Sequence, residues 1–178
     1  MGQYYRPVLK FKKTMVYNRD VNGEYTMAKL TEHSWWENDL MKAISEKIFR
    51  KPTLVAWVGD YAENEEVRMM NKKMKDIWDC EGHNVKSTNF SINNLYLCNH
   101  DLKEYINMNK YRKNSEVDGW CLHPLSLLTA IGNGRGGGDY HDCYVNADKI
   151  GIWAWHRLSF EKEIPENYTE FEIIFKEN

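Results

Sequence analysis

Four side chains that could ligate a metal ion stand at the ends of expected elements or beside glycine: His33, Asp60, His123 and Asp139. A side chain in such a position can point into a cavity that several segments share. Mixed sets of imidazole and carboxylate ligands are typical of catalytic zinc, manganese or iron. The sequence therefore predicts one bound divalent ion, with zinc as the preferred metal. The alternative is that each residue caps a helix or closes a turn.

A second set of candidate ligands contains thiols. Every cysteine has a histidine within three residues, and two residues that are two apart in a strand face the same side. Cys98, His100 and Cys121 therefore form an alternative zinc site with thiolate ligands. The spacing is not that of a zinc finger, and the competing interpretation is that Cys98 and Cys121 are small buried residues.

The stretch from Gly132 to Tyr140 contains five of the eleven glycines of the chain. It lacks the lysine of a phosphate-binding P-loop, and it follows an expected helix instead of opening one, as a dinucleotide-binding loop would. One interpretation is a binding loop with Asn133, Arg135 and Tyr140 as its contact residues. The other is a helix end that leads into a long surface turn.

The candidate ligands are consistent with a small metal-dependent hydrolase or nucleotide-processing enzyme. In that case the metal would activate a water molecule, and Arg135 would contact an anionic substrate. No nucleophile is indicated, because Ser126 does not lie in a Gly-x-Ser-x-Gly turn. The spacing of Cys121 and His123 assigns no catalytic geometry.

Composition limits the class of protein. At 178 residues and 42% apolar residues, the chain suits one folded domain. A net charge of −2 does not predict direct binding to nucleic acid, and we interpret the basic patches, Lys10 to Lys13 among them, as solvated surface. The sequence has no apolar run of membrane-spanning length and no leader-like start, so a cytoplasmic location is expected, with reduced thiols.

Apolar patterning predicts two principal helices. One runs from a capping box at Ser34 and Glu37 to about residue 49, and the second covers residues 63–78. A short apolar helix is expected over 125–131. Asn22-Gly23 predicts a hairpin. Further strands are expected over residues 8–12, 15–17, 24–30, 53–58, 95–98, 104–111, 150–158 and 169–175. Because strands and helices do not alternate regularly, the expected fold is a single α+β domain over 1–178 with a mainly antiparallel sheet.

Several blocks of sequence resemble a family of short proteins from phages and mobile elements of Gram-positive bacteria. The resemblance covers nearly the whole chain. It is carried by the segments 1–5, 32–36, 58–62, 123–125 and 132–140, which read MGQYY, EHSWW, VGDYA, HPL and GNGRGGGDY. These blocks contain His33, Asp60, His123 and Asp139, which favours that ligand set over the thiolate set.

Some phage proteins of this type are type II-A anti-CRISPR proteins, that is, inhibitors of the nuclease Cas9. The resemblance implies a protein in the bacterial cytoplasm that binds Cas9 and blocks the loading of target DNA, without catalysis of its own. Cas9 holds nucleic acid in positively charged channels. Acidic side chains could mimic phosphates there, and the candidates for this role are Glu63, Glu65 and Glu66.

Overall fold

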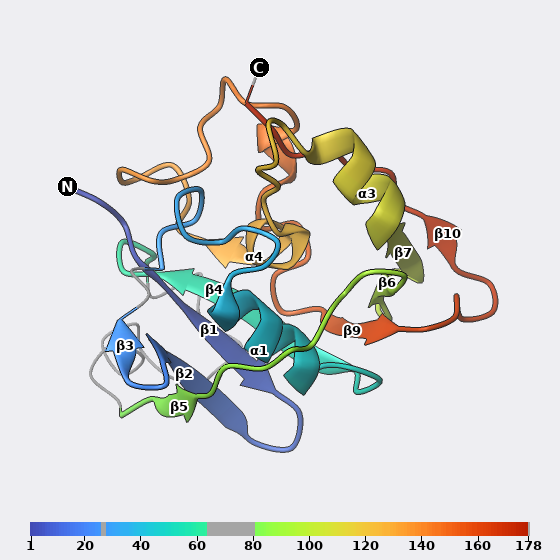
Figure 1. Ribbon diagram of the computed structural model, residues 1–178, viewed down its shortest axis with the longest axis horizontal. Coiled ribbons are helices and arrows are strands. Elements are labelled where there is room, and N and C mark those ends of the chain that lie inside the picture. Colours follow the sequence, from blue (N-terminus) through green and yellow to red (C-terminus); the bar gives the residue numbers. More distant parts are fainter. Residues whose placement is uncertain (26–27, 64–80, 178) are drawn as a thin grey trace.

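The computed structural model describes residues 1–25, 28–63 and 81–177. One mixed sheet and a small number of helices form a single α+β unit, as expected (Figure 1). The strands are β1 Tyr5–Lys10, β2 Thr14–Val21, β3 Glu24–Tyr25, β4 Thr53–Gly59, β5 His83–Val85, β6 Tyr96–Asn99, β7 Glu104–Asn107, β8 Ala130–Ile131, β9 Arg157–Glu161 and β10 Thr169–Glu170. The helices are α1 Asp39–Lys47, α3 Met108–Ser115, α4 Pro124–Leu128 and a 3-10 turn at Ala147–Lys149.

The strands follow the order β10-β7-β6-β9-β4-β1-β2-β3, with β5 beside β2 and β8 beside β4. The neighbours along the main path pair antiparallel, except that β10 runs parallel to β7. The β4 strand lies near the centre, where it pairs with β1, β8 and β9. Its almost continuous burial explains its apolar sequence, which correctly predicted a buried strand.

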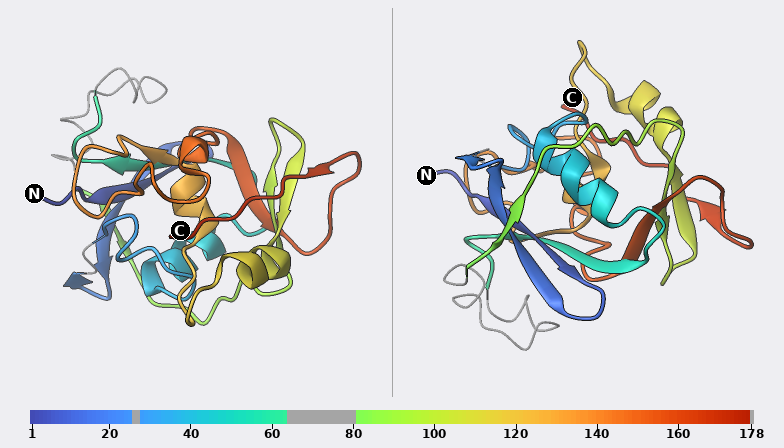
Figure 2. Two further views of the ribbon diagram at one scale, coloured as in Figure 1. Left: turned by 90° about the horizontal axis from the view of Figure 1, so that it is seen from above. Right: turned by 60° about the horizontal axis from the view of Figure 1, so that its bottom comes forward.

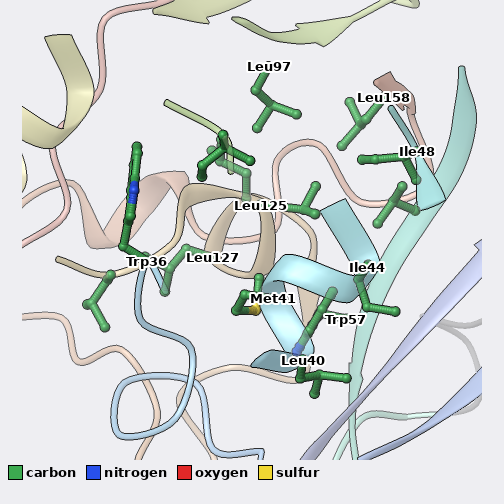
Figure 3. Packing of buried hydrophobic residues seen from close by; sticks show 14 of the residues in the cluster. Trp36, Leu40, Met41, Ile44, Ile48, Trp57, Leu97, Leu125, Leu127 and Leu158 are labelled. Carbon is green, nitrogen blue, oxygen red and sulfur yellow. The ribbon is translucent and has the colours of Figure 1, made fainter. Parts of the chain in front are cut away.

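Helix α1 closes the core on one side of the sheet. Leu40, Ile44 and Ile48 are four residues apart and all buried, together with Met41. In Figure 3 these residues lie among Trp57 of β4, the leucines of α4 and Leu158 of β9. The sequence predicted this apolar face, and the helix fixes the position of the β1–β2 hairpin beneath it.

The start of α1 differs from the prediction. The N-cap is Asn38, whose side chain accepts hydrogen bonds from the amides of Leu40 and Met41 at 2.9 and 3.3 Å. Ser34 is instead buried, and its hydroxyl points back to the carbonyl of Lys29. The predicted capping box does not form, and Trp35, which lies between its two residues, forms a bridge with Leu122.

Two predicted strands are shorter than the apolar patterns suggested. The region 150–156 consists of turns, in which Gly151 and Trp155 have left-handed backbone angles, φ 78° and 62°. The last predicted strand is hydrogen-bonded as a strand only at Thr169–Glu170, although Ile173 and Phe175 beyond it are buried. In both cases the aromatic residues fill the core from irregular backbone, so burial does not imply strand pairing.

Four further elements differ in type or extent. The strand predicted over 24–30 is confirmed only at Glu24–Tyr25, and its described residues 28–30 are not in a strand. The predicted strand 104–111 ends at Asn107, whose side chain caps α3 by accepting from the amide of Lys110 at 3.1 Å. The predicted helix 125–131 is confirmed only as far as Leu128, where it gives way to β8. The predicted helix 63–78 lies outside the described residues, apart from Glu63.

Candidate functional site

The glycine loop, residues 132–140, is closed around its own aspartate. Asp139 is fully buried. One of its carboxylate oxygens, Oδ2, accepts hydrogen bonds from the amides of Gly134, Arg135 and Gly136 at 2.8, 2.8 and 2.9 Å. The other oxygen, Oδ1, accepts from the hydroxyl of Tyr5 at 2.8 Å. Consecutive amides that converge in this way make an anion-binding nest, and here the nest is filled by the chain's own carboxylate.

The three residues predicted to contact a ligand also hold the loop together. Asn133 donates to the carbonyl of Tyr140 at 2.9 Å and accepts from its amide at 2.8 Å. Arg135 donates to the carbonyl of Tyr61 at 2.9 Å. The Tyr140 hydroxyl donates to carbonyl oxygen at Val145, 2.6 Å away. The three residues predicted to contact a ligand therefore form hydrogen bonds to other parts of this protein.

The loop is joined to the N-terminal segment, which runs alongside it. The amide of Gln3 donates to Gly137, and the amide of Gly137 donates to Met1, each at 3.0 Å. A side chain at Gly136 would place its Cβ 2.5 Å from Cβ of Gln3, so glycine is required there. In Figure 1 the orange loop accordingly returns toward the N-terminus. The sequence blocks 1–5, 58–62 and 132–140, which are far apart in the chain, are thus joined by hydrogen bonds.

His123, the first predicted metal ligand, is a fully buried helix cap. Its Nδ1 accepts from the amide of Leu125 at 3.2 Å, so Nε2 carries the proton and faces the hydroxyl of Ser45 at 3.3 Å. Burial lowers the pKa of the imidazole to about 3, and the side chain is neutral at physiological pH. Both ring nitrogens are occupied by partners within the protein.

The other two members of the predicted ligand set bind locally. His33 accepts from the amide of Lys29 at 3.3 Å through Nδ1, and burial lowers the pKa of its ring. Asp60 accepts from the amide of Tyr4 at 3.1 Å. Among the residues that the structure describes, no group of three or more His, Cys, Asp or Glu side chains is placed to hold a metal ion. The predicted zinc site stays a prediction.

The thiolate set is dispersed among core and sheet positions. Cys98 and Cys121 are buried free thiols, and burial raises the pKa of each to about 12. Thiols of this kind are poor sources of thiolate at neutral pH. His100 is close to Cys98 in sequence, but its two ring nitrogens contact Tyr168 and Ser159.

That histidine belongs to a polar chain that the sequence analysis did not identify. The Ser159 hydroxyl donates to Glu161 Oε1 at 2.5 Å, so its oxygen accepts from Nε2 of His100 at 2.6 Å. The Tyr168 hydroxyl then donates to Nδ1 at 2.8 Å. In a catalytic serine–histidine pair the serine hydroxyl donates to the histidine, whereas here the histidine donates to the serine. Strand pairing of β6 with β9 brings these residues together, and no local spacing reveals it.

An exposed aromatic surface lies on the turn after α3, which protrudes beside the C-terminus in Figure 2. We call it the Trp120 surface; it comprises Trp35, Val117 and Trp120. The Trp120 side chain is 46% exposed, and its ring centroid is 5.1 Å from that of Trp35. A hollow of about 330 Å³ adjoins it, lined in part by Leu122 and Phe175.

The acidic residues expected to contact a partner are only partly described. Glu63 is exposed, whereas Glu65 and Glu66 lie outside the described residues. Within the described part of the chain, every helix is too short or too polar to cross a membrane. Comparison with protein-family models, with curated proteins and with solved structures found no match. Inferences about function therefore rest on the chain's own residues.

Proposed function

We propose that this protein acts by binding a protein partner, and that the partner is a bacterial effector nuclease such as Cas9. The nuclease is suggested by the sequence resemblance. A binding role is supported by the Trp120 surface, which is the observation that carries the proposal. The predicted metal ligands give no comparable support to the hydrolase alternative, because each has a partner within the fold.

The backbone turn that carries Trp120 is held by hydrogen bonds within the protein. Val117 and Trp120 exchange two backbone hydrogen bonds of 2.9 and 2.8 Å across a tight turn. Asp118 and Gly119, at the centre of this turn, have left-handed angles of φ 50° and 80°, as a type I′ turn requires. A fixed tryptophan loses little conformational entropy on binding, and tryptophan is enriched among residues that dominate binding energy.

The chemistry of the hollow favours a protein over a polyanion. Its floor is apolar, and its rim carries one charge of each sign, Lys176 and Glu177. An apolar side chain from a partner could enter the hollow beside Trp120, while the mixed rim would repel neither acidic nor basic partners. An apolar centre inside a polar rim is the usual anatomy of a protein interface.

The test is target-DNA binding and cleavage by Cas9 in the presence of the protein. We expect inhibition that saturates at one equivalent, because an inhibitor of this kind does not turn over. Trp120→Ala should weaken inhibition by at least about 30-fold, the equivalent of roughly 2 kcal/mol for an interface anchor. Leu102→Ala is the matched control, since Leu102 is an exposed apolar residue elsewhere on the surface, 49% accessible.

Two outcomes would refute this proposal. Unchanged DNA binding and cleavage at micromolar protein would remove Cas9 as the partner. Turnover of phosphodiesters or nucleotides with added zinc or manganese would instead favour the hydrolase. Elemental analysis of the purified protein addresses the predicted zinc separately. If His123 is a ligand, His123→Ala should lose the metal, although binding there requires the ring to release Leu125 or Ser45.

A further inference from the structure

A basic groove lies on another part of the molecule. It is lined by the tip of the β1–β2 hairpin and the C-terminal end of α1, two elements that Figure 1 shows near one another. Its volume is about 460 Å³. We define it by four lysines and two aromatic residues, namely Phe11, Lys12, Lys13, Tyr17, Lys47 and Lys51. The groove is built by two separate segments, because the core packing of α1 against the sheet holds its last turn above the hairpin.

Charge in this groove has one sign. Among the residues that the structure describes, no acidic side chain lines it, in a chain whose formal net charge is −2. All four lysines are exposed, and among the described residues none of them forms an ion pair. Some lysines elsewhere are neutralised, as is Lys110, which binds Glu170 at 3.1 Å, and the groove is distinguished by bringing four lysines from two segments together. The groove therefore concentrates positive potential where an anionic ligand can reach it.

Aromatic rings lie between the positive charges. The ammonium of Lys51 is 4.4 Å from the ring centroid of Phe11, and that of Lys47 is 5.2 Å from the centroid of Tyr17. Phe11 is nevertheless 53% exposed. A large exposed phenylalanine in a hairpin tip is costly in water, but it offers a flat surface on which a nucleobase can stack.

We propose that this groove binds single-stranded nucleic acid, with the lysines on the phosphates and Phe11 against a base. Single strands present phosphate and accessible bases together, which matches the alternation of lysine and aromatic residues. A flat anionic lipid surface would reach the lysines and Phe11 at the rim of the groove but would leave its interior unfilled. An acidic peptide would match the charge but would leave the Phe11 ring without a planar partner.

The net charge of −2 did not predict direct binding of nucleic acid. The groove proposal differs because binding depends on the local arrangement of charge. It does not rest on the proposed function: it concerns a different surface, and its test uses the protein alone. Failure of either proposal therefore leaves the other unaffected.

The experiment measures fluorescence anisotropy of labelled oligo(dT) and oligo(U) with the purified protein at 50 and 200 mM salt. Contacts to four phosphates predict that affinity falls about 50-fold across this range, since the salt slope of a single strand is roughly −0.7 per contact. Tighter binding of one oligonucleotide would identify DNA or RNA as the preferred ligand. Phe11→Ala should weaken binding roughly 10-fold through lost stacking, with less effect on the salt slope.

Two variants that each lose four positive charges, one in the groove and one elsewhere, test where the nucleic acid binds. The change of Lys12, Lys13, Lys47 and Lys51 to Gln should abolish measurable binding at 200 mM salt. The matched control changes the exposed Lys86, Lys103, Lys113 and Lys162 to Gln, and it should retain at least half of the affinity. Circular dichroism confirms that both variants fold.

Three results would overturn the proposal. These are no binding of either oligonucleotide at 50 mM salt, equal losses in the two quadruple variants, or binding to phosphatidylserine vesicles in preference to oligonucleotides. The last would identify an anionic lipid surface as the ligand.

Discussion

The glycine loop and the basic groove use their polar groups in opposite ways. In the loop, the carboxylate of Asp139 is saturated by three amides and a tyrosine hydroxyl. In the groove, four lysines stand exposed without an ion pair among the described residues. The loop is rich in residues typical of binding sites, yet those residues stabilise the fold. Residue type alone therefore identifies only a candidate: the polar groups of the loop are bonded within the fold, whereas the groove gathers exposed lysines beside an exposed aromatic ring.

The largest expected loss of stability comes from removing the Asp139 carboxylate from the glycine loop. Asp139→Ala leaves three amides and the Tyr5 hydroxyl without their acceptor, so the free energy of unfolding should fall by more than about 3 kcal/mol. Urea denaturation measures this fall. A loss below about 1 kcal/mol would mean that the carboxylate does not hold the loop.

A comparison of two glycines separates close packing from backbone strain. Gly136→Ala should cost about 2–3 kcal/mol, because the new Cβ would lie 2.5 Å from Cβ and 2.7 Å from the backbone nitrogen of Gln3. Gly134→Ala should cost only about 1 kcal/mol, since its φ is 89° but its surroundings are open. Equal losses in urea denaturation would contradict the tight contact of the loop with the N-terminal segment.

Tyr5→Phe removes a single bond from Asp139 and leaves the three amides in place. The free energy of unfolding should fall by about 1.5 kcal/mol, the usual contribution of a hydrogen bond to a charged acceptor. Burial, followed by the charge of Asp139, raises the pKa of Tyr5 above its ordinary value, so the hydroxyl remains a donor at every pH of the measurement. A loss as large as that of Asp139→Ala would show that Tyr5, and not the nest, holds the carboxylate.

The buried imidazole of His123 should make the free energy of unfolding depend on pH. Its pKa is about 3 in the fold and 6.5 for an ordinary solvated imidazole, so the unfolded chain binds the proton first as pH falls. The contribution is complete above pH 6.5 and is lost toward pH 3, with about 1 kcal/mol lost between pH 6.5 and 5.5. His123→Asn keeps an acceptor for the Leu125 amide and does not titrate. Its stability curve should therefore be flatter over this interval, and identical curves would refute the buried neutral ring.

Sequence reasoning predicted the elements whose apolar pattern is continuous. It placed β4, the apolar face of α1 and the Asn22-Gly23 hairpin, where φ values of 54° and 84° match the expected turn. It did not predict the turns at 150–156, because Trp153 and Trp155 are buried from irregular backbone. An apolar sequence pattern predicts which residues are buried in the core, but it does not predict whether their backbone is a strand or a turn.

Candidate sites were harder to predict because they depend on contacts distant in sequence. The partner of Asp139 is Tyr5, 134 residues away, and the Ser159 that occupies His100 is 59 residues away. The groove joins residues 11–17 to 47–51, two short basic stretches that each resemble ordinary solvated surface. Only the fold shows that the two stretches line one groove, in which the described lining residues carry no acidic side chain.

The contrast between loop and groove is tested most directly by a titration of the ¹⁵N-labelled protein with oligo(dT), followed by two-dimensional NMR. We predict saturable shifts of the amide signals at Phe11, Lys12, Lys13, Lys47 and Lys51. The amides of Gly134, Arg135 and Gly136, which bind Asp139, should not shift. Saturable shifts at the glycine-loop amides with none in the groove would contradict the account, because the nest would then be open to an external phosphate.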